Sequence, residues 1–136
     1  MSQIRRELRM RDLYNFPRRS YWLRRMENEG RKERVSVDEY TIEHIMPQTL
    51  NQAWKDALMP DGQQVHAKWL DTLGNLTLSG YNSELGNRLF SDKKRLLLES
   101  NFALSRDLQN FEVWDGAAIQ RRGEELALRA VTIWRR

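Results

Sequence analysis

A glutamate and a histidine stand side by side at Glu43 and His44, in a run that ends at Pro47. A carboxylate can hold a divalent cation, and an imidazole that titrates near neutral pH can take a proton from water. The apolar and β-branched flanks predict a short strand over 40–45, which proline ends. Neighbouring strand side chains point to opposite faces, so the two groups serve one site only if the strand end twists or bulges. The alternative is an ordinary half-buried pair.

Two asparagines flank a second predicted strand over 76–78. Asn75 precedes it, and Asn82 follows it where a helical stretch opens and then restarts near Ser91. An amide can fix a neighbouring loop through hydrogen bonds, and its carbonyl oxygen is a hard ligand suited to magnesium or manganese. Taken singly, Asn75 reads as a turn residue and Asn82 as a helix N-cap.

Together, these segments resemble the signature of the HNH, or ββα-metal (His-Me finger), nucleases. The run from Glu43 to Gln48 is similar to the D/E-H-I-x-P-Q motif of that superfamily, which includes the HNH domains of RNA-guided DNA nucleases. Asn75 falls at the middle Asn of the signature, and Asn82 falls at its third letter, which is His or Asn. The resemblance implies an α+β fold with a ββα-metal core.

A narrower resemblance covers about residues 13 to 134. Over this range the chain is similar to the C-terminal HNH domain of GmrSD-type proteins, the modification-dependent type IV restriction endonucleases and related phage-defence nucleases. The matching segments include 40–48, 73–78, 81–85 and Ile133-Trp134. The resemblance implies a prokaryotic, cytoplasmic endonuclease that hydrolyses DNA, with modified phage DNA as a target.

In that family an N-terminal half hydrolyses nucleotide through a D-G-Q-Q-R motif. Here 61–64 reads Asp-Gly-Gln-Gln but is followed by Val65, between the two predicted strands, and we interpret this match as coincidence. We therefore expect the chain to be the nuclease part of a longer protein whose nucleotide-hydrolysing half is not in this sequence.

The resemblance also implies roles for single residues. His44 is the expected general base and Asn75 the catalytic residue that positions its loop, while Glu43 and Asn82 are the expected ligands of Mg2+ or Mn2+. Three basic residues near or in the helix after Asn82 are candidate phosphate contacts, with a solvated helix face as the alternative. They are Arg88, Lys93 and Lys94.

The amino-acid composition excludes several kinds of site and segment. The chain has no cysteine, which excludes disulfides, thiolate zinc sites and cysteine nucleophiles, and it has no apolar run long enough to span a membrane. It also lacks the glycine-rich phosphate loops of common nucleotide-binding sites. Residues 1–34 hold 11 Lys/Arg and 5 Asp/Glu, a net charge of +6 against −2 for the rest. Such a block contacts polyanions or is simply solvated.

We expect one domain over 1–136, mostly helical, with a two-stranded antiparallel ribbon plus helix at its centre. Its parts are a basic helical lead-in over 1–34, the ββα-metal core over 40–100 and a C-terminal helical buttress over 101–136. Helices are predicted over 2–14, 18–29, 51–58, 63–71 and from Asp115 onward, the last with a buried stripe that includes Ile119, Gly123, Leu126 and Ala130.

The other histidine and three of the tryptophans are expected to have structural roles. His66 is expected to pack or be solvated between the strands, and Trp54, Trp69 and Trp114 are expected in the core. Two rival functions remain open. One is a non-catalytic nucleic-acid-binding module with a decayed HNH site, and the other is an interaction domain whose helices pack on a lost N-terminal half.

Overall fold

The computed structural model describes residues 19–28, 41–79, 85–99 and 102–134. The predicted helix over 2–14 and the placement of Asn82 lie outside these ranges.

The sheet is an antiparallel pair of strands, β1 (Thr41–His44) and β2 (Leu76–Ser79). Their register places His44 opposite Leu76. The main-chain N–H of Ile45 donates to the Asn75 carbonyl at 2.9 Å, which carries the pairing one residue beyond the ends of the two strands. The two predicted strands are therefore confirmed, and the pairing brings the His44 and Asn75 segments together.

Helices make up most of the remaining described chain, which confirms the predicted α+β class. Asn51 caps one of them, because its side-chain oxygen accepts a hydrogen bond from the Trp54 N–H at 3.0 Å. The helices predicted over 18–29, 51–58 and 63–71 correspond to α2 (Arg19–Asn28), α3 (Gln52–Leu58) and α4 (Gly62–Trp69).

Helix α6 (Phe90–Glu99) begins next to Ser91, where the sequence predicted a helix restart. The predicted C-terminal helical segment, residues 101–136, contains two kinds of helix, because residues Ala103–Asn110 form the 3-10 helix η3 before α7 begins. The buried carboxylate of Glu27 in α2 accepts the N–H groups of Ala103 and Leu104 at 2.8 and 2.9 Å. These bonds satisfy donors that a helix start leaves open, and they fasten η3 to α2.

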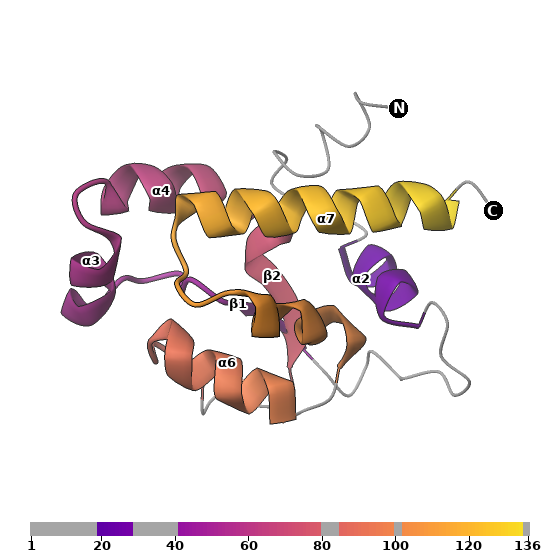
Figure 1. Ribbon diagram of the computed structural model, residues 1–136, viewed down its shortest axis with the longest axis horizontal. Helices are drawn as coiled ribbons and strands as arrows, with labels where there is room; N and C mark the ends of the chain where they lie inside the picture. The colour runs from indigo at the N-terminus through magenta and orange to yellow at the C-terminus, as the bar shows by residue number, and fades with distance from the viewer. Residues whose placement is uncertain (1–18, 29–40, 80–84, 100–101, 135–136) are drawn as a thin grey trace.

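Helix α7 (Gly116–Trp134) packs on the short 3-10 helix η2 (Leu73–Asn75) that leads into β2. In Figure 1, α7 runs along one side of the molecule and α6 along the other, with β2 between them. The approach at Gly74 is so close that a Cβ atom there would lie 2.0 Å from the Ile119 carbonyl oxygen. Glycine at position 74 therefore lets η2 lie directly on the α7 backbone.

Among the described residues, the buried apolar side chains form two clusters. One includes Trp54, Trp69 and Trp114, which confirms that these tryptophans are core residues. The other joins α2 and β2 to Leu126, Ala127 and Ala130 of α7. The predicted α7 stripe of Ile119, Gly123, Leu126 and Ala130 is buried along its length, with Ile119 in the first cluster. Within the described part of the chain, no helix has the length and apolar character needed to cross a membrane.

Candidate active site

Asn75 is buried at the end of η2, where its side-chain amide joins three segments of the chain. Its Oδ1 accepts hydrogen bonds from the Met46 N–H at 2.7 Å and from Trp114 Nε1 at 2.9 Å. Its Nδ2 donates to the carbonyls of Met46 and Leu70, both at 2.9 Å. Both ends of the amide are therefore satisfied, and the loop that follows His44 is held at its Met46 peptide groups.

His44 is the last residue of β1 and is only 6% exposed. Its Nε2 lies 2.8 Å from Asp71 Oδ1, in the turn between α4 and η2. The sequence did not single out Asp71, because nothing in its local pattern distinguishes it from a solvated turn carboxylate.

The surroundings of His44 bear on its charge. Burial lowers the pKa of His44 below its ordinary value of 6.5, because the charged imidazolium loses its hydration. The hydrogen bond and negative charge of Asp71 act in the opposite direction and offset part of this shift, while the charges of Lys93 and His66 add to it. A lowered pKa keeps His44 neutral at pH 7, which is the form that accepts a proton.

A pocket of about 370 Å³ opens beside the end of β1. Glu43 and His44, at the end of β1, both contribute to its wall. Its other walls come from the loop after β1 and from the segment before α6, with Pro47, Gln48, Thr49 and Asn87 among the lining residues.

Glu43 is buried against Lys93 of α6. Lys93 Nζ lies 3.1 Å from Glu43 Oε2 and donates to the His44 carbonyl at 2.8 Å. Burial raises the pKa of Glu43, and the Lys93 charge offsets part of that rise. Burial likewise lowers the pKa of Lys93, and the Glu43 charge offsets part of that fall. Each group thus reduces the cost of burying the other.

The three candidate phosphate contacts differ in placement. Lys93 is fully buried, so its ammonium faces Glu43 and the His44 carbonyl rather than solvent. Lys94 is partly buried and donates to the Phe111 carbonyl at 2.7 Å. Arg88 is exposed in the segment before α6. The solvated-face alternative therefore does not describe Lys93.

The pocket chemistry fits a hard divalent cation. Glu43 Oε2 is buried and contacts the Lys93 ammonium at 3.1 Å, while Gln48, Thr49 and Asn87, with their amide and hydroxyl oxygens, line the same pocket. No group of three His, Cys, Asp or Glu residues forms a ready-made metal site among the residues described. An ion would therefore keep several waters, as magnesium does, and would compete with Lys93 for Glu43.

Comparison with known families places the chain in one of them. Residues 2–128 match the family model described as GmrSD restriction endonucleases, C-terminal domain. The chain belongs to this family. No curated protein and no solved structure matches significantly. A family of restriction endonucleases implies a nuclease domain whose substrate is DNA.

In this GmrSD C-terminal domain the predicted site residues are only partly assembled among the described ones. Glu43 and His44 share the pocket wall, and Asn75 holds the loop that follows them. Asn82 lies outside the described residues, while Asn87, a little further along the chain, lines the pocket.

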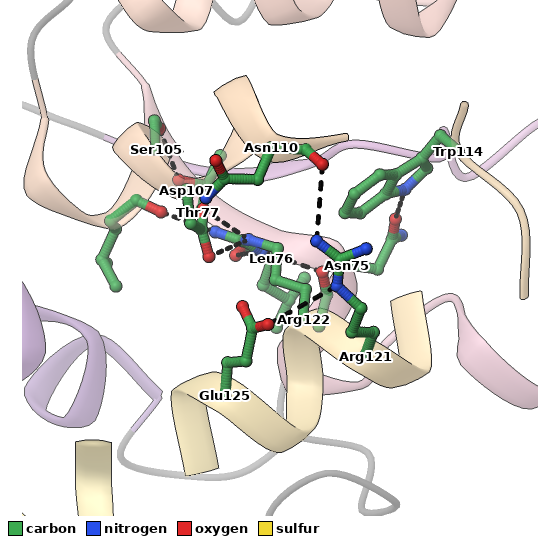
Figure 2. Close-up of polar contacts among 12 residues, drawn as sticks. Asn75, Leu76, Thr77, Ser105, Asp107, Asn110, Trp114, Arg121, Arg122 and Glu125 are labelled. Carbon is green, nitrogen blue, oxygen red and sulfur yellow. Dashed lines mark hydrogen bonds and ion pairs between the residues drawn. The ribbon is translucent and has the colours of Figure 1, made fainter. Parts of the chain in front are cut away.

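Arg122 of α7 is a second residue that sequence reasoning missed. Its fully buried guanidinium donates to the carbonyls of Gly74, Leu76 and Leu104 and to the Asp107 carboxylate, at 2.7–3.1 Å (Figure 2). Charge-assisted bonds from one planar group fix η2, β2 and η3 relative to α7. An available signal was its spacing, since Arg122 lies three residues after Ile119 on the stripe predicted to be buried.

His66 supports the pocket from α4. Its Nε2 lies 3.0 Å from the Pro47 carbonyl oxygen, in the loop after β1. This contact agrees with the expectation that His66 packs in the segment between the two strands. It also connects α4 to the pocket wall.

Proposed function

We propose that this GmrSD C-terminal domain is a metal-dependent DNA endonuclease in which His44 is the general base. One observation carries the proposal. His44 forms the wall of a polar pocket at a strand end that the buried Asn75 amide holds in place, and Glu43 stands beside it. The fold supplies a fixed imidazole, and the lowered pKa of His44 keeps that imidazole neutral at pH 7.

The proposed reaction is hydrolysis of a phosphodiester. The neutral imidazole of His44 takes a proton from a water molecule as the water oxygen forms a bond to phosphorus. The bond from phosphorus to the leaving 3′ oxygen breaks, its electron pair goes to that oxygen, and the oxygen takes a proton from solvent. His44 then returns its proton to solvent, which restores the neutral base.

Glu43 and Asn82 are the proposed ligands of Mg2+ or Mn2+. When bound, the ion supplies positive charge that stabilises the negative charge developing on the phosphate and the leaving oxygen. Asn75 keeps the loop after His44 at the pocket wall through its bonds to Met46. Each of these residues thus has a separate task.

Of the three candidate phosphate contacts, Arg88 is the best placed to contact a DNA phosphate, because it is exposed next to the pocket-lining Asn87. Lys94 would reach a phosphate only by giving up its bond to the Phe111 carbonyl. For Lys93 we propose contact with Glu43 instead of contact with DNA, since its side chain is buried.

We also propose a setting for this activity. By the family resemblance, the substrate is modified phage DNA in a prokaryotic cytoplasm. An N-terminal nucleotide-hydrolysing half selects the target, so the domain itself needs to recognise only the DNA backbone.

The deciding experiment is plasmid cleavage in magnesium by the chain and by His44→Ala. We expect His44→Ala to abolish nicking while circular dichroism shows that the variant is folded, because the imidazole that takes the proton is removed. His66→Ala, the matched change at the other histidine, should lose less than about tenfold, since His66 contacts the loop and not the reaction. Full activity of His44→Ala would refute His44 as the base.

A non-catalytic DNA-binding domain is the second candidate, and one observation favours it. Lys93 already neutralises the Glu43 carboxylate, as a decayed metal site would require. Salt-sensitive DNA binding without cleavage in magnesium or manganese would support this candidate, whereas cleavage abolished by a chelator would exclude it.

A further inference from the structure

Asp71 and His44 come from segments that are distant in the sequence, yet their side chains form a 2.8 Å contact between Asp71 Oδ1 and His44 Nε2. His44 is nearly fully buried, and Asp71 is only partly exposed. A carboxylate is an acceptor only, so the ring nitrogen facing it must carry the proton. The contact therefore selects one of the two neutral forms of the ring.

The positions of both residues are set by Asn75. Its Nδ2 donates to the carbonyl of Met46, two residues after His44, and to the carbonyl of Leu70, the residue before Asp71. On the other side of Asp71, Thr72 donates both its N–H and its hydroxyl to the Trp69 carbonyl, at 3.2 and 2.8 Å. One buried amide thus ties the histidine and carboxylate segments together.

The two residues relate differently to the pocket. His44 belongs to the pocket wall, whereas Asp71 is not among the described residues that line it. A substrate in the pocket would therefore meet His44 and not Asp71. Any effect of Asp71 on the reaction must act through His44.

We propose that Asp71 is a positioning residue that holds His44 with its proton on Nε2, so that Nδ1 carries the lone pair which takes the proton from the attacking water. This inference rests on the proposed function of His44. When Nδ1 accepts that proton, the ring becomes an imidazolium, and the Asp71 carboxylate stabilises its charge. The only proton that moves in this step goes from water to Nδ1.

The first test reads the ring directly. Long-range 1H–15N correlation spectra of the 15N-labelled chain at pH 7.5 distinguish a protonated ring nitrogen from one that carries a lone pair. The chain has two histidines, so His66→Gln assigns the His44 signals. We expect the proton on Nε2 of His44. A proton on Nδ1 overturns the proposal without any measurement of activity.

The second test changes the carboxylate. Asp71→Asn retains the shape of the side chain but gives it a donor as well as an acceptor, so the ring is no longer confined to one form. We expect a mixed or reversed ring form and a fall in kcat of about 10-fold to 100-fold with little change in KM. Asp71→Glu keeps the carboxylate and should recover part of the loss.

A matched control is Asp61→Asn, the same change at an exposed aspartate before α4 whose side chain makes no capping hydrogen bond. It should leave the ring form and kcat unchanged. If Asp71→Asn behaves like this control, the proposal fails. Circular dichroism establishes that each variant is folded. Even if Asp71→Asn does not fold, the 1H–15N correlation spectrum of the unaltered chain decides which ring nitrogen of His44 carries the proton.

The proposals that His44 is the base and that Asp71 positions it can fail separately. An active His44→Ala variant would remove His44 as the base, whatever the ring form. An inactive His44→Ala variant together with a proton on Nδ1 would keep the endonuclease proposal and remove Asp71 as its positioning residue.

Discussion

Lys93 and Glu43 form a buried ion pair, with Lys93 Nζ 3.1 Å from Glu43 Oε2. The same ammonium donates to the carbonyl of His44 at 2.8 Å, so one lysine fastens α6 to the end of β1. Burial opposes both charges, and each partner offsets part of that cost for the other. Removal of one partner is therefore expected to cost more than removal of both.

Lys93→Met should lower the free energy of unfolding by about 3 kcal/mol at pH 7.5, because it leaves the Glu43 carboxylate buried without its counter-charge. The measurement is urea denaturation followed by circular dichroism. The double variant Lys93→Met/Glu43→Gln should recover much of the loss, since it buries no net charge. A double variant less stable than Lys93→Met would contradict the interpretation.

The cost of Lys93→Met should also depend on pH. Burial raises the pKa of Glu43 above its ordinary value of 4.5, and loss of Lys93 raises it further. A carboxyl group with a raised pKa in the folded state destabilises the fold fully above that pKa and not at all below its unfolded value. The destabilisation should therefore shrink as the pH falls toward 4.5. Lys94→Met, at the partly buried neighbour, should show no such dependence.

Arg122→Lys should destabilise the chain by about 2–4 kcal/mol, because an ammonium cannot reproduce the planar fork that binds Asp107 and three carbonyls. The adjacent Arg121 provides the control. Its ion pair with Glu125 is exposed at 3.5 Å (Figure 2), so Arg121→Lys should change stability by less than about 0.5 kcal/mol. Equal effects of the two substitutions would show that the buried network adds nothing.

Gly74→Ala should destabilise the chain by about 3 kcal/mol and reduce cleavage, because the new Cβ atom would lie 2.0 Å from the Ile119 carbonyl and must push η2 away from α7. Asn75, the next residue, would move with it. Gly116→Ala tests the same change where the nearest atom outside its chain neighbours is at 3.4 Å, an ordinary contact. That variant should be as stable as the parent chain in thermal unfolding, and a comparable loss there would contradict the packing argument.

Local patterns predicted most of the fold. Strand signals located β1 and β2, and helix signals located α2, α3, α4 and α7, because each depends on residues close together in the chain. The 3-10 geometry of η3 had no such signal. It depends on Glu27 of α2 accepting its first N–H groups, a contact made only after the two segments pack together.

The residues of the candidate site were likewise predictable only in part. Motif spacing located Glu43, His44 and Asn75, and the structure brings Glu43 and His44 to one pocket wall with Asn75 holding the loop beyond them. The partners of these residues were not predictable. Asp71 pairs with His44, and Lys93 pairs with Glu43, only because the turn after α4 and helix α6 both reach the end of β1 in the folded chain. The sequence around a charged residue in a helix or turn does not show which distant group its side chain will contact.

The pH dependence of cleavage gives a last prediction. Burial lowers the pKa of His44 below 6.5, and the base works only when neutral, so single-turnover cleavage at saturating magnesium should fall as the pH drops, with a midpoint below 6.5. Asp71 raises the pKa of His44 through its hydrogen bond and charge, so Asp71→Asn should move that midpoint to still lower pH while lowering the plateau rate. Asp61→Asn should leave the midpoint in place. A midpoint above 6.5, or a shift to higher pH in Asp71→Asn, would mean that a group other than His44 controls the reaction.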